Sequence, residues 1–178
     1  MRARRRIAGL IALAGAGCLT AGLAVSANAS SQTENVYPVI NLTTWETLKC
    51  VAVPGANPAD KVQVIQFPCN IKLDSEQQWA VTDVGLDDYD NSSYIFKNKK
   101  TGKCLTAAGG NGGPVWQYTC LAAHDNQIWS YDKAYRLHNH SSGDCLAVPG
   151  GPREDVVKLI HWTCGDGKEQ KWTLVPPG

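Results

Sequence analysis

Six cysteines are the residues whose type and spacing point most directly to chemistry in this chain. Taken two at a time in chain order, they lie 19, 16 and 19 residues apart: Cys50 and Cys69, Cys104 and Cys120, and Cys145 and Cys164. The seventh cysteine, Cys18, lies in the N-terminal segment that we expect to be removed. The even number that remains in an exported protein implies disulfides, although six cysteines can pair in many ways. A zinc site built from thiolates needs closely spaced pairs, and this chain has none, so its spacing favours disulfides.

Other reactive side chains form no catalytic set. Hydrolysis of a glycoside requires two carboxylates that face each other across a cleft, and no serine or cysteine nucleophile has a nearby base. The acidic residues gather in one stretch, which contains Asp83, Asp87, Asp88 and Asp90. A solvated turn explains this stretch, with a loose calcium site as the alternative. We therefore predict that the protein is not an enzyme and has no cofactor.

The four histidines are the remaining candidates for metal binding. They are His124, His138, His140 and His161. These residues could bind zinc, but they do not share one repeat, and strand-like alternation accounts for His138 and His140. The sequence therefore predicts no metal site.

The N-terminus has the pattern of a secretory signal peptide over residues 1–29. Four arginines among the first six residues precede an apolar run from Ile7 to Val25, and the small residues Ala27-Asn28-Ala29 follow. Cleavage after Ala29 would leave 149 residues, enough for one domain, with a short leader over 30–38. We expect an extracellular protein with a bacterial-type signal peptide and no membrane span.

The net charge argues against strongly anionic partners. The whole chain carries +1, and removal of four arginines leaves 13 basic and 16 acidic residues, a net charge of −3. Such a protein has no general electrostatic attraction to nucleic acid or to anionic lipid. One local basic run contains Lys97, Lys99, Lys100 and Lys103. A solvated hairpin explains this run, with a polyanion site as the alternative.

One sequence pattern occurs three times within residues 39–178, in units of about 40–82, 94–132 and 135–175. Each unit contains one cysteine pair and ends in Gln-x-Trp, at Gln77-Gln78-Trp79, Gln127-Ile128-Trp129 and Gln170-Lys171-Trp172. The repeat makes one pairing consistent: Cys50 with Cys69, Cys104 with Cys120, and Cys145 with Cys164. The terminal motifs are 50 and then 43 residues apart, which predicts an insertion around Asp83 to Ser93.

Within each unit the sequence predicts short strands joined by turns. Apolar runs of four to six residues are bounded by Gly, Pro, Asn and Asp, and no segment has helical spacing over three turns. Residues two apart in a strand share a face, so each Gln-x-Trp places an amide beside an indole. We expect the tryptophans in the core and the glutamines bonded to the backbone of turns.

Three units with a Gly-x-Cys-Leu motif, an aromatic residue two positions before the second cysteine and a terminal Gln-x-Trp resemble the ricin B-chain lectin family. The resemblance covers roughly Ile40 to Pro177, and the first unit departs from it by having Leu48 and Val51 where the others have glycine and leucine. The family implies an all-β fold, the β-trefoil: a six-stranded barrel closed by three hairpins, with Trp79, Trp129 and Trp172 in the core. It also implies disulfides within each repeat.

The resemblance implies a sugar site in each unit, and this chain keeps only part of it. The family's stacking aromatic corresponds to Phe67, Tyr118 and Trp162. Its carboxylate, two residues after the first cysteine, corresponds to Ala52, Thr106 and Ala147, so all three units lack it. Its asparagine before the terminal glutamine is kept only as Asn126, with Glu76 and Glu169 in the other units.

The second unit is the first candidate pocket on this pattern. Tyr118 would stack on a sugar, while Thr106 and Asn126 would bond its hydroxyls. Gln127 would orient Asn126, and Asn111 lies in a loop above.

The third unit is the next candidate, with Trp162, His161 and Glu169, the last standing in for the missing carboxylate. The structural alternative is that these rings are partly buried strand residues and Asn126 a turn residue. We predict a monomeric module that binds glycan or polysaccharide weakly and multivalently. The rival hypothesis is a protein-binding trefoil, an inhibitor or a targeting subunit, that has lost the sugar site.

Overall fold

The computed structural model describes residues 40–70, 76–122 and 124–176. The predicted signal peptide and leader lie outside these residues. The part described consists of strands and three short 3-10 turns, η1 (Pro54–Ala56), η2 (Asp125–Gln127) and η3 (Lys168–Gln170). Within it, no helix has the length and apolar character needed to cross a membrane.

The strands divide among the three units. The first unit contains β1 (Asn41–Thr44), β2 (Cys50–Ala52), β3 (Val62–Gln63), β4 (Ile65–Phe67) and β5 (Trp79–Leu86). The second contains β6 (Ser92–Asn98), β7 (Cys104–Ala107), β8 (Val115–Tyr118) and β9 (Trp129–Tyr131). The third contains β10 (Leu137–Asn139), β11 (Cys145–Ala147), β12 (Val157–Lys158), β13 (Ile160–Trp162) and β14 (Trp172–Val175).

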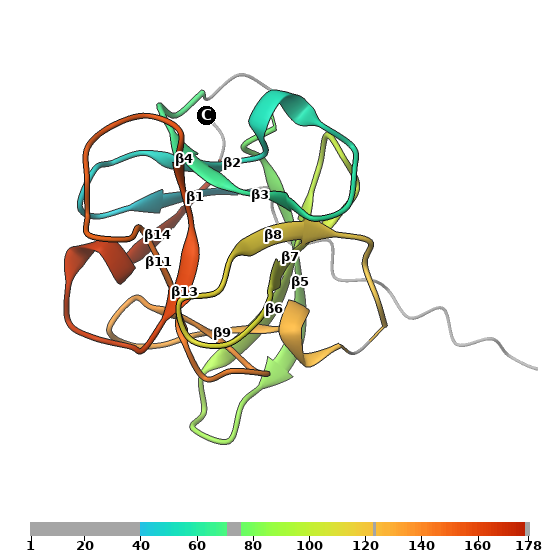
Figure 1. Ribbon diagram of the computed structural model, residues 1–178. Helices are drawn as coiled ribbons and strands as arrows, with labels where there is room; N and C mark the ends of the chain where they lie inside the picture. Colours follow the sequence, from blue (N-terminus) through green and yellow to red (C-terminus); the bar gives the residue numbers. More distant parts are fainter. Residues whose placement is uncertain (1–39, 71–75, 123, 177–178) are drawn as a thin grey trace, which may run out of the picture. The chain divides into compact units, whose positions relative to one another are not determined.

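The first and last strands of each unit form a closed six-stranded barrel. Antiparallel pairs join β1 to β14, β5 to β6, β6 to β9 and β9 to β10. Two single bridges complete the ring: Ile40 pairs with Trp79, and Arg136 pairs with Lys171. Each unit also supplies one hairpin, β2–β4, β7–β8 or β11–β13 (Figure 1). The two-residue strands β3 and β12 pair with β8 and β4. The predicted β-trefoil is confirmed.

Three tryptophans form the centre of the core. Trp79, Trp129 and Trp172 begin β5, β9 and β14 and have no exposed surface. Each indole Nε1–H donates to a backbone carbonyl of its own unit, at Val51, Leu105 and Leu146, over 3.1, 3.0 and 2.9 Å. A buried indole keeps its apolar area and still satisfies its polar atom, which explains why tryptophan suits this position.

The terminal glutamines perform one task in all three units. The Gln127 amide accepts the Leu121 N–H at 2.8 Å and donates to the Thr119 carbonyl at 3.0 Å. Gln77 bonds Asn70 and Pro68 in the same way, and Gln170 bonds Gly165 and Thr163. Each amide therefore closes the turn that follows its unit's second cysteine, which satisfies backbone groups that burial would otherwise leave unpaired.

The predicted disulfides are confirmed. Cys50 bonds Cys69, Cys104 bonds Cys120, and Cys145 bonds Cys164, each with a Cα–Cα distance of 5.0 Å. Each closed loop should add on the order of 3 kcal/mol by restricting the unfolded chain.

The insertion between the first two units is a long hairpin, with a bulge where the register shifts between Asp83 and Gly85. Its turn uses Asp87, whose Oδ1 accepts the N–H groups of Tyr89 and Asn91 at 2.9 and 2.8 Å. Burial acts to raise the pKa of Asp87, but hydrogen bonds from Asn91, Ser130 and Tyr89 outweigh it and hold the pKa well below its usual range. This carboxylate is thus occupied in its own turn.

Candidate functional site

A pocket of about 280 Å³ lies in the third unit, at the position where the sequence placed its second candidate site. It is lined by Ala147, Val148, Pro149, Gly150, Ile160, Trp162, Glu169 and Gln170. The Trp162 side chain is 48% exposed although it sits at the end of strand β13. A half-exposed indole beside a carboxylate presents an apolar face and a hydrogen-bond acceptor to the same ligand.

Trp162 is held by a loop of the second unit. The loop between β7 and β8 lies beside β13 (Figure 1), and Pro114 pairs with Ile160. The Gly112 N–H donates to the His161 carbonyl at 2.8 Å, and the His161 N–H donates to the Gly113 carbonyl at 3.1 Å. A Cβ at Gly112 would lie 2.8 Å from a carbon of the Trp162 ring, and Gly112 has a φ of +84°. The indole therefore rests on a glycine that no other residue can replace without displacement.

Asn111 belongs to this same support. Its side-chain oxygen accepts the N–H of Thr163, the residue after Trp162, at 2.9 Å. The sequence placed Asn111 above a pocket of the second unit, but this bond is made to the third unit. Asn111 thus positions the strand end that carries Trp162.

His161 is not available for direct contact with a ligand, contrary to its predicted role. It has no exposed surface. Its Nδ1 lies 3.0 Å from a carboxylate oxygen of Asp144, and its Nε2 lies 3.1 Å from the carbonyl oxygen of Ala108. Both ring nitrogens are engaged, so the side chain joins β13 to the loop of the preceding unit.

The other two units show what His161 replaces. The buried Gln117, three residues before its second cysteine like His161, donates to the carbonyls of Asn57 and Ala59 in the preceding unit. Gln66, at the same place in the first unit, donates to the carbonyls of Pro152 and Glu154 in the third. Sequence reasoning missed this role. The signal was present, because a polar residue occurs three positions before the second cysteine in every unit.

Glu169 lines the pocket with its carboxylate folded against the backbone of Gly167. A Cβ at Gly167 would collide with both carboxylate oxygens of Glu169. Glu169 lies in the 3-10 turn η3, directly before the buried Gln170. Among the described residues, its carboxylate has no hydrogen-bond or ion-pair partner. It is therefore free to accept hydrogen bonds from a ligand.

The second unit does not assemble the set that the sequence proposed there. Thr106 is buried, and its hydroxyl donates to the Cys104 carbonyl at 2.9 Å and accepts from the Gln127 amide at 3.1 Å. Gln127 therefore orients Thr106 and its own turn, while the predicted contact to Asn126 is not among its bonds.

Tyr118 and Asn126 also occupy different surroundings. Asn126 lines a pocket of about 290 Å³ with His124, Asp125 and Ser141, and Tyr118 is not among its lining residues. The side-chain oxygen of Asn126 is buried and has no hydrogen-bond partner within the described residues. Tyr118 is half-buried on β8. The structure therefore favours the third unit over the second.

The described part of the chain brings together one set of metal-ligand atoms, from His138, Cys145 and Cys164. It differs from the histidine group considered from the sequence. Of that group, His161 is buried between β13 and the preceding loop, and His140 bonds the hydroxyls of Ser93 and Ser130 through Nε2.

Comparison with known sequences agrees with the β-trefoil fold described above. Residues 38–172 match the ricin-type beta-trefoil lectin domain. One component of the cytolethal distending toxin of Campylobacter jejuni is 31% identical over 99 residues, which cover 50% of this chain and 36% of that protein. The chain thus matches little more than a third of the length of this relative.

Solved structures share the same architecture. ThreeFoil, a designed threefold-symmetric protein, superposes with a TM-score of 0.67 at 27% identity, over 77% of this chain and 97% of its own. The C-terminal half of an earthworm R-type lectin, solved with GalNAc, gives a TM-score of 0.60 at 14% identity over the same shares, which supports the fold alone. Because the family match spans residues 38–172, most of the sequence, this chain belongs to the ricin-type beta-trefoil lectin domain family.

Proposed function

We propose that this protein is an exported, non-catalytic module that binds glycans through its third unit. The observation that carries the proposal is the exposed Trp162 indole in one pocket with the unpaired carboxylate of Glu169, which has no partner among the described residues. The C–H face of a sugar ring packs on an indole, and a carboxylate accepts hydrogen bonds from two neighbouring hydroxyls.

Glu169 would supply the charge that Ala147 cannot. The two residues line the same pocket from different elements, Ala147 on β11 and Glu169 in η3. A hydrogen bond to a charged group contributes about 1.5–3 kcal/mol, which is a large share of the roughly 4 kcal/mol of a millimolar complex. A single site of this kind is weak, so we propose that the ligand is a polymer on which several contacts act together.

The test is a glycan array followed by calorimetric titration of each positive sugar with three proteins: wild type, Trp162→Ala and Tyr118→Ala. Trp162→Ala should weaken binding about tenfold or more, because 1.4 kcal/mol of lost contact is a factor of ten. Tyr118→Ala, the matched change in the second unit, should leave affinity nearly unchanged. An array without hits, or equal affinity in all three proteins, would refute the proposal.

A second candidate is a module that binds a protein partner. Two observations favour it: no unit has the family carboxylate, and the Campylobacter relative is named as one subunit of a toxin. A pull-down from the secreted proteins of the host separates the two candidates. A stoichiometric protein partner that competing sugars do not displace would support the second candidate.

A further inference from the structure

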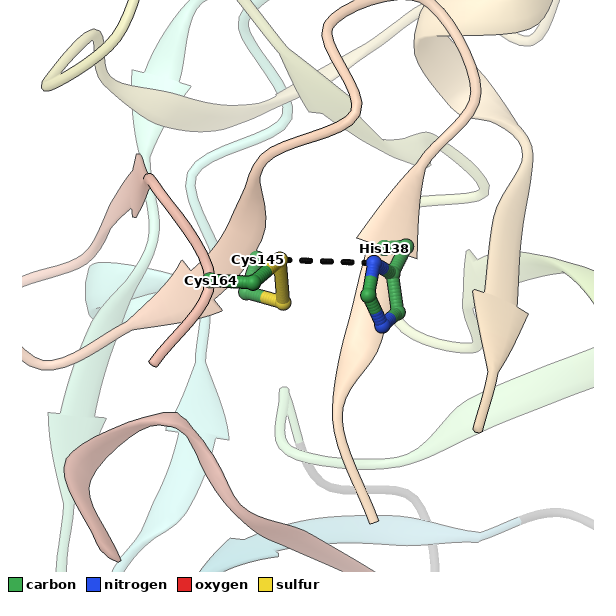
Figure 2. Close-up of side chains that lie close together, drawn as sticks. All are labelled: His138, Cys145 and Cys164. Carbon is green, nitrogen blue, oxygen red and sulfur yellow. Dashed lines mark hydrogen bonds between the residues drawn. A yellow bond between two sulfur atoms is a disulfide. The ribbon is translucent and has the colours of Figure 1, made fainter. Parts of the chain in front are cut away.

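The disulfide of the third unit has a histidine beside it. Figure 2 shows His138, from β10, next to the bond between Cys145 and Cys164. His138 pairs in register with Cys145, and its Nδ1 lies 3.3 Å from Cys164 Sγ. The three ligand atoms lie within 4.8 Å of one another.

The pseudosymmetry of the fold makes this position specific to the third unit. The residue paired with the first cysteine is Thr43 in the first unit and Lys97 in the second. Thr43 Oγ1 lies 3.5 Å from Cys50 Sγ. Neither threonine nor lysine is a usual zinc ligand, whereas histidine and cysteine are the commonest ones.

A carboxylate orients the histidine from its other side. His138 Nε2 lies 2.6 Å from an oxygen of Asp132. Asp132 is itself fixed, because it accepts the N–H groups of Ala134 and Arg136 at 2.9 and 2.8 Å and the Arg136 Nε–H at 2.8 Å. In the neutral ring, this contact places the proton on Nε2 and leaves the lone pair of Nδ1 directed at the sulfurs. Metal-binding histidines are typically oriented by such a carboxylate.

We propose that reduction of the Cys145–Cys164 disulfide creates a zinc site formed by His138 Nδ1 and the two cysteine sulfurs. A dithiol supplies two electrons and two protons and becomes a disulfide itself, which leaves Cys145 and Cys164 as thiols. The zinc ion then displaces both thiol protons, and water takes the fourth position. The oxidised form has no thiolate, so metal affinity at this site depends on the redox state.

The geometry allows a tetrahedral ion with limited movement. The two sulfurs must separate to about 3.8 Å, the spacing set by two Zn–S bonds of about 2.3 Å. Cys145 lies on β11, whereas Cys164 lies beyond the end of β13. Cys164 can therefore move without breaking a strand pair. The Cα–Cα distance of 5.0 Å already suits two thiolates on one ion.

A pocket borders this position on the side of His138. His138 and Gly143 line a pocket of about 690 Å³ between the long hairpin and the third unit. The ionisable groups that line it are Asp87, Asp88, Tyr89, Asp132, Arg136, His138 and His140. Three carboxylates against one guanidinium leave the pocket negative when the histidines are neutral, which favours entry of a divalent cation.

The experiment uses the full exported chain reduced with a phosphine, which does not compete strongly for the metal. Alkylation and mass spectrometry identify which cysteines are reduced, and Co²⁺ reports thiolate coordination through its visible and near-ultraviolet absorption before Zn²⁺ displaces it. Reduced wild type should bind one equivalent at this site. His138→Thr, which copies the first unit, should lose the thiolate-cobalt spectrum, and Asp132→Asn should weaken binding about 10–100-fold.

His124→Ala is the matched control and should bind as wild type does. The proposal is overturned if the reduced protein gives no thiolate-cobalt spectrum, if His138→Thr binds equally well, or if the oxidised protein gives the same spectrum. If reduction unfolds the chain, added Zn²⁺ should restore its near-ultraviolet circular dichroism in wild type but not in His138→Thr, since metal binding is then coupled to folding. The proposal is also overturned if Zn²⁺ does not restore the near-ultraviolet circular dichroism of the wild-type protein.

Discussion

The second and third units share one scaffold but present different surfaces. In both, the terminal tryptophan is buried, the terminal glutamine closes the turn after the second cysteine, and the disulfide lies within the unit. The stacking position differs, since Tyr118 is half-buried while Trp162 is 48% exposed in a pocket. The shared pattern therefore specifies the fold, and the residues that vary within it give the two units different surfaces.

The support of the stacking strand also differs in its chemistry. Thr119 N–H, directly after Tyr118, donates to Asp60 Oδ1 at 2.7 Å. Thr163 N–H, directly after Trp162, donates to Asn111 Oδ1 at 2.9 Å. In each of these two units, a side chain of the preceding unit accepts this hydrogen bond. The acceptor is the carboxylate of Asp60 for the second unit and the neutral amide of Asn111 for the third. The site of a unit is built partly by its neighbour.

The largest expected effect tests the shared scaffold. Trp129→Ala and Trp172→Ala should each lower the free energy of unfolding by about 3–5 kcal/mol, because each removes a fully buried indole and its hydrogen bond. Urea denaturation followed by circular dichroism measures this loss. Values that differ by several kcal/mol between the two units would show that their cores are not equivalent.

The next effect tests whether His161 is structural. His161→Ala should cost about 1–3 kcal/mol, because Ala108 and Asp144 lose a buried partner. His161→Gln, which copies Gln66 and Gln117, should recover much of this stability and keep glycan affinity. Thermal unfolding measures the stability of both variants, and calorimetric titration measures their glycan affinity. A stable His161→Gln protein without glycan affinity would show that His161 contacts the glycan.

A smaller effect separates the third-unit pocket from its support. Gly112→Ala should cost about 1–2 kcal/mol for a residue at positive φ and should displace Trp162, with a loss of glycan affinity of about tenfold. Gly110→Ala is the matched control in the same loop, since a Cβ there meets nothing within 4 Å. Equal affinity in the two variants would mean that the loop does not position the indole.

The smallest effect concerns pH. Hydrogen bonding from Lys103 lowers the pKa of Asp60 most strongly; burial opposes it, and the bonds from Thr119 add to the lowering. A carboxyl with a lowered folded pKa stabilises the fold above its unfolded pKa of about 4 and loses this contribution as pH falls through the folded value. Acidification should therefore perturb the Thr119 amide before the Thr163 amide in NMR spectra. Asp60→Asn should abolish this difference, and equal responses in wild type would contradict the prediction.

The repeat made the three-unit organisation and the disulfides predictable, and the resemblance that it carries made the fold predictable. Three copies of Gln-x-Trp with one cysteine pair each leave one consistent arrangement, and the observed pairs follow it. The closed barrel from Ile40 to Val175 was expected from the resemblance to the ricin B-chain lectin family, whereas the repeat itself predicted three units of short strands and turns.

The site was less predictable because a sequence pattern describes one unit at a time. The pattern placed Asn111 above the pocket of the second unit, whereas its side chain accepts a hydrogen bond from Thr163 of the third unit. It also placed His161 among the sugar contacts, since alternation alone does not reveal that a loop of the preceding unit covers this residue. A contact between residues about fifty positions apart leaves no local pattern.

The sequence by itself determined the architecture: three units, their cysteine pairs and the tryptophans that fill the core. Periodic burial of apolar side chains is encoded locally and repeats with the chain. Only the tertiary structure decided that Thr106 is buried, that Trp162 lies open beside Glu169, and that His138 faces a disulfide. These outcomes depend on which loop of one unit packs on which strand of the next, and packing between units is set by three-dimensional contact.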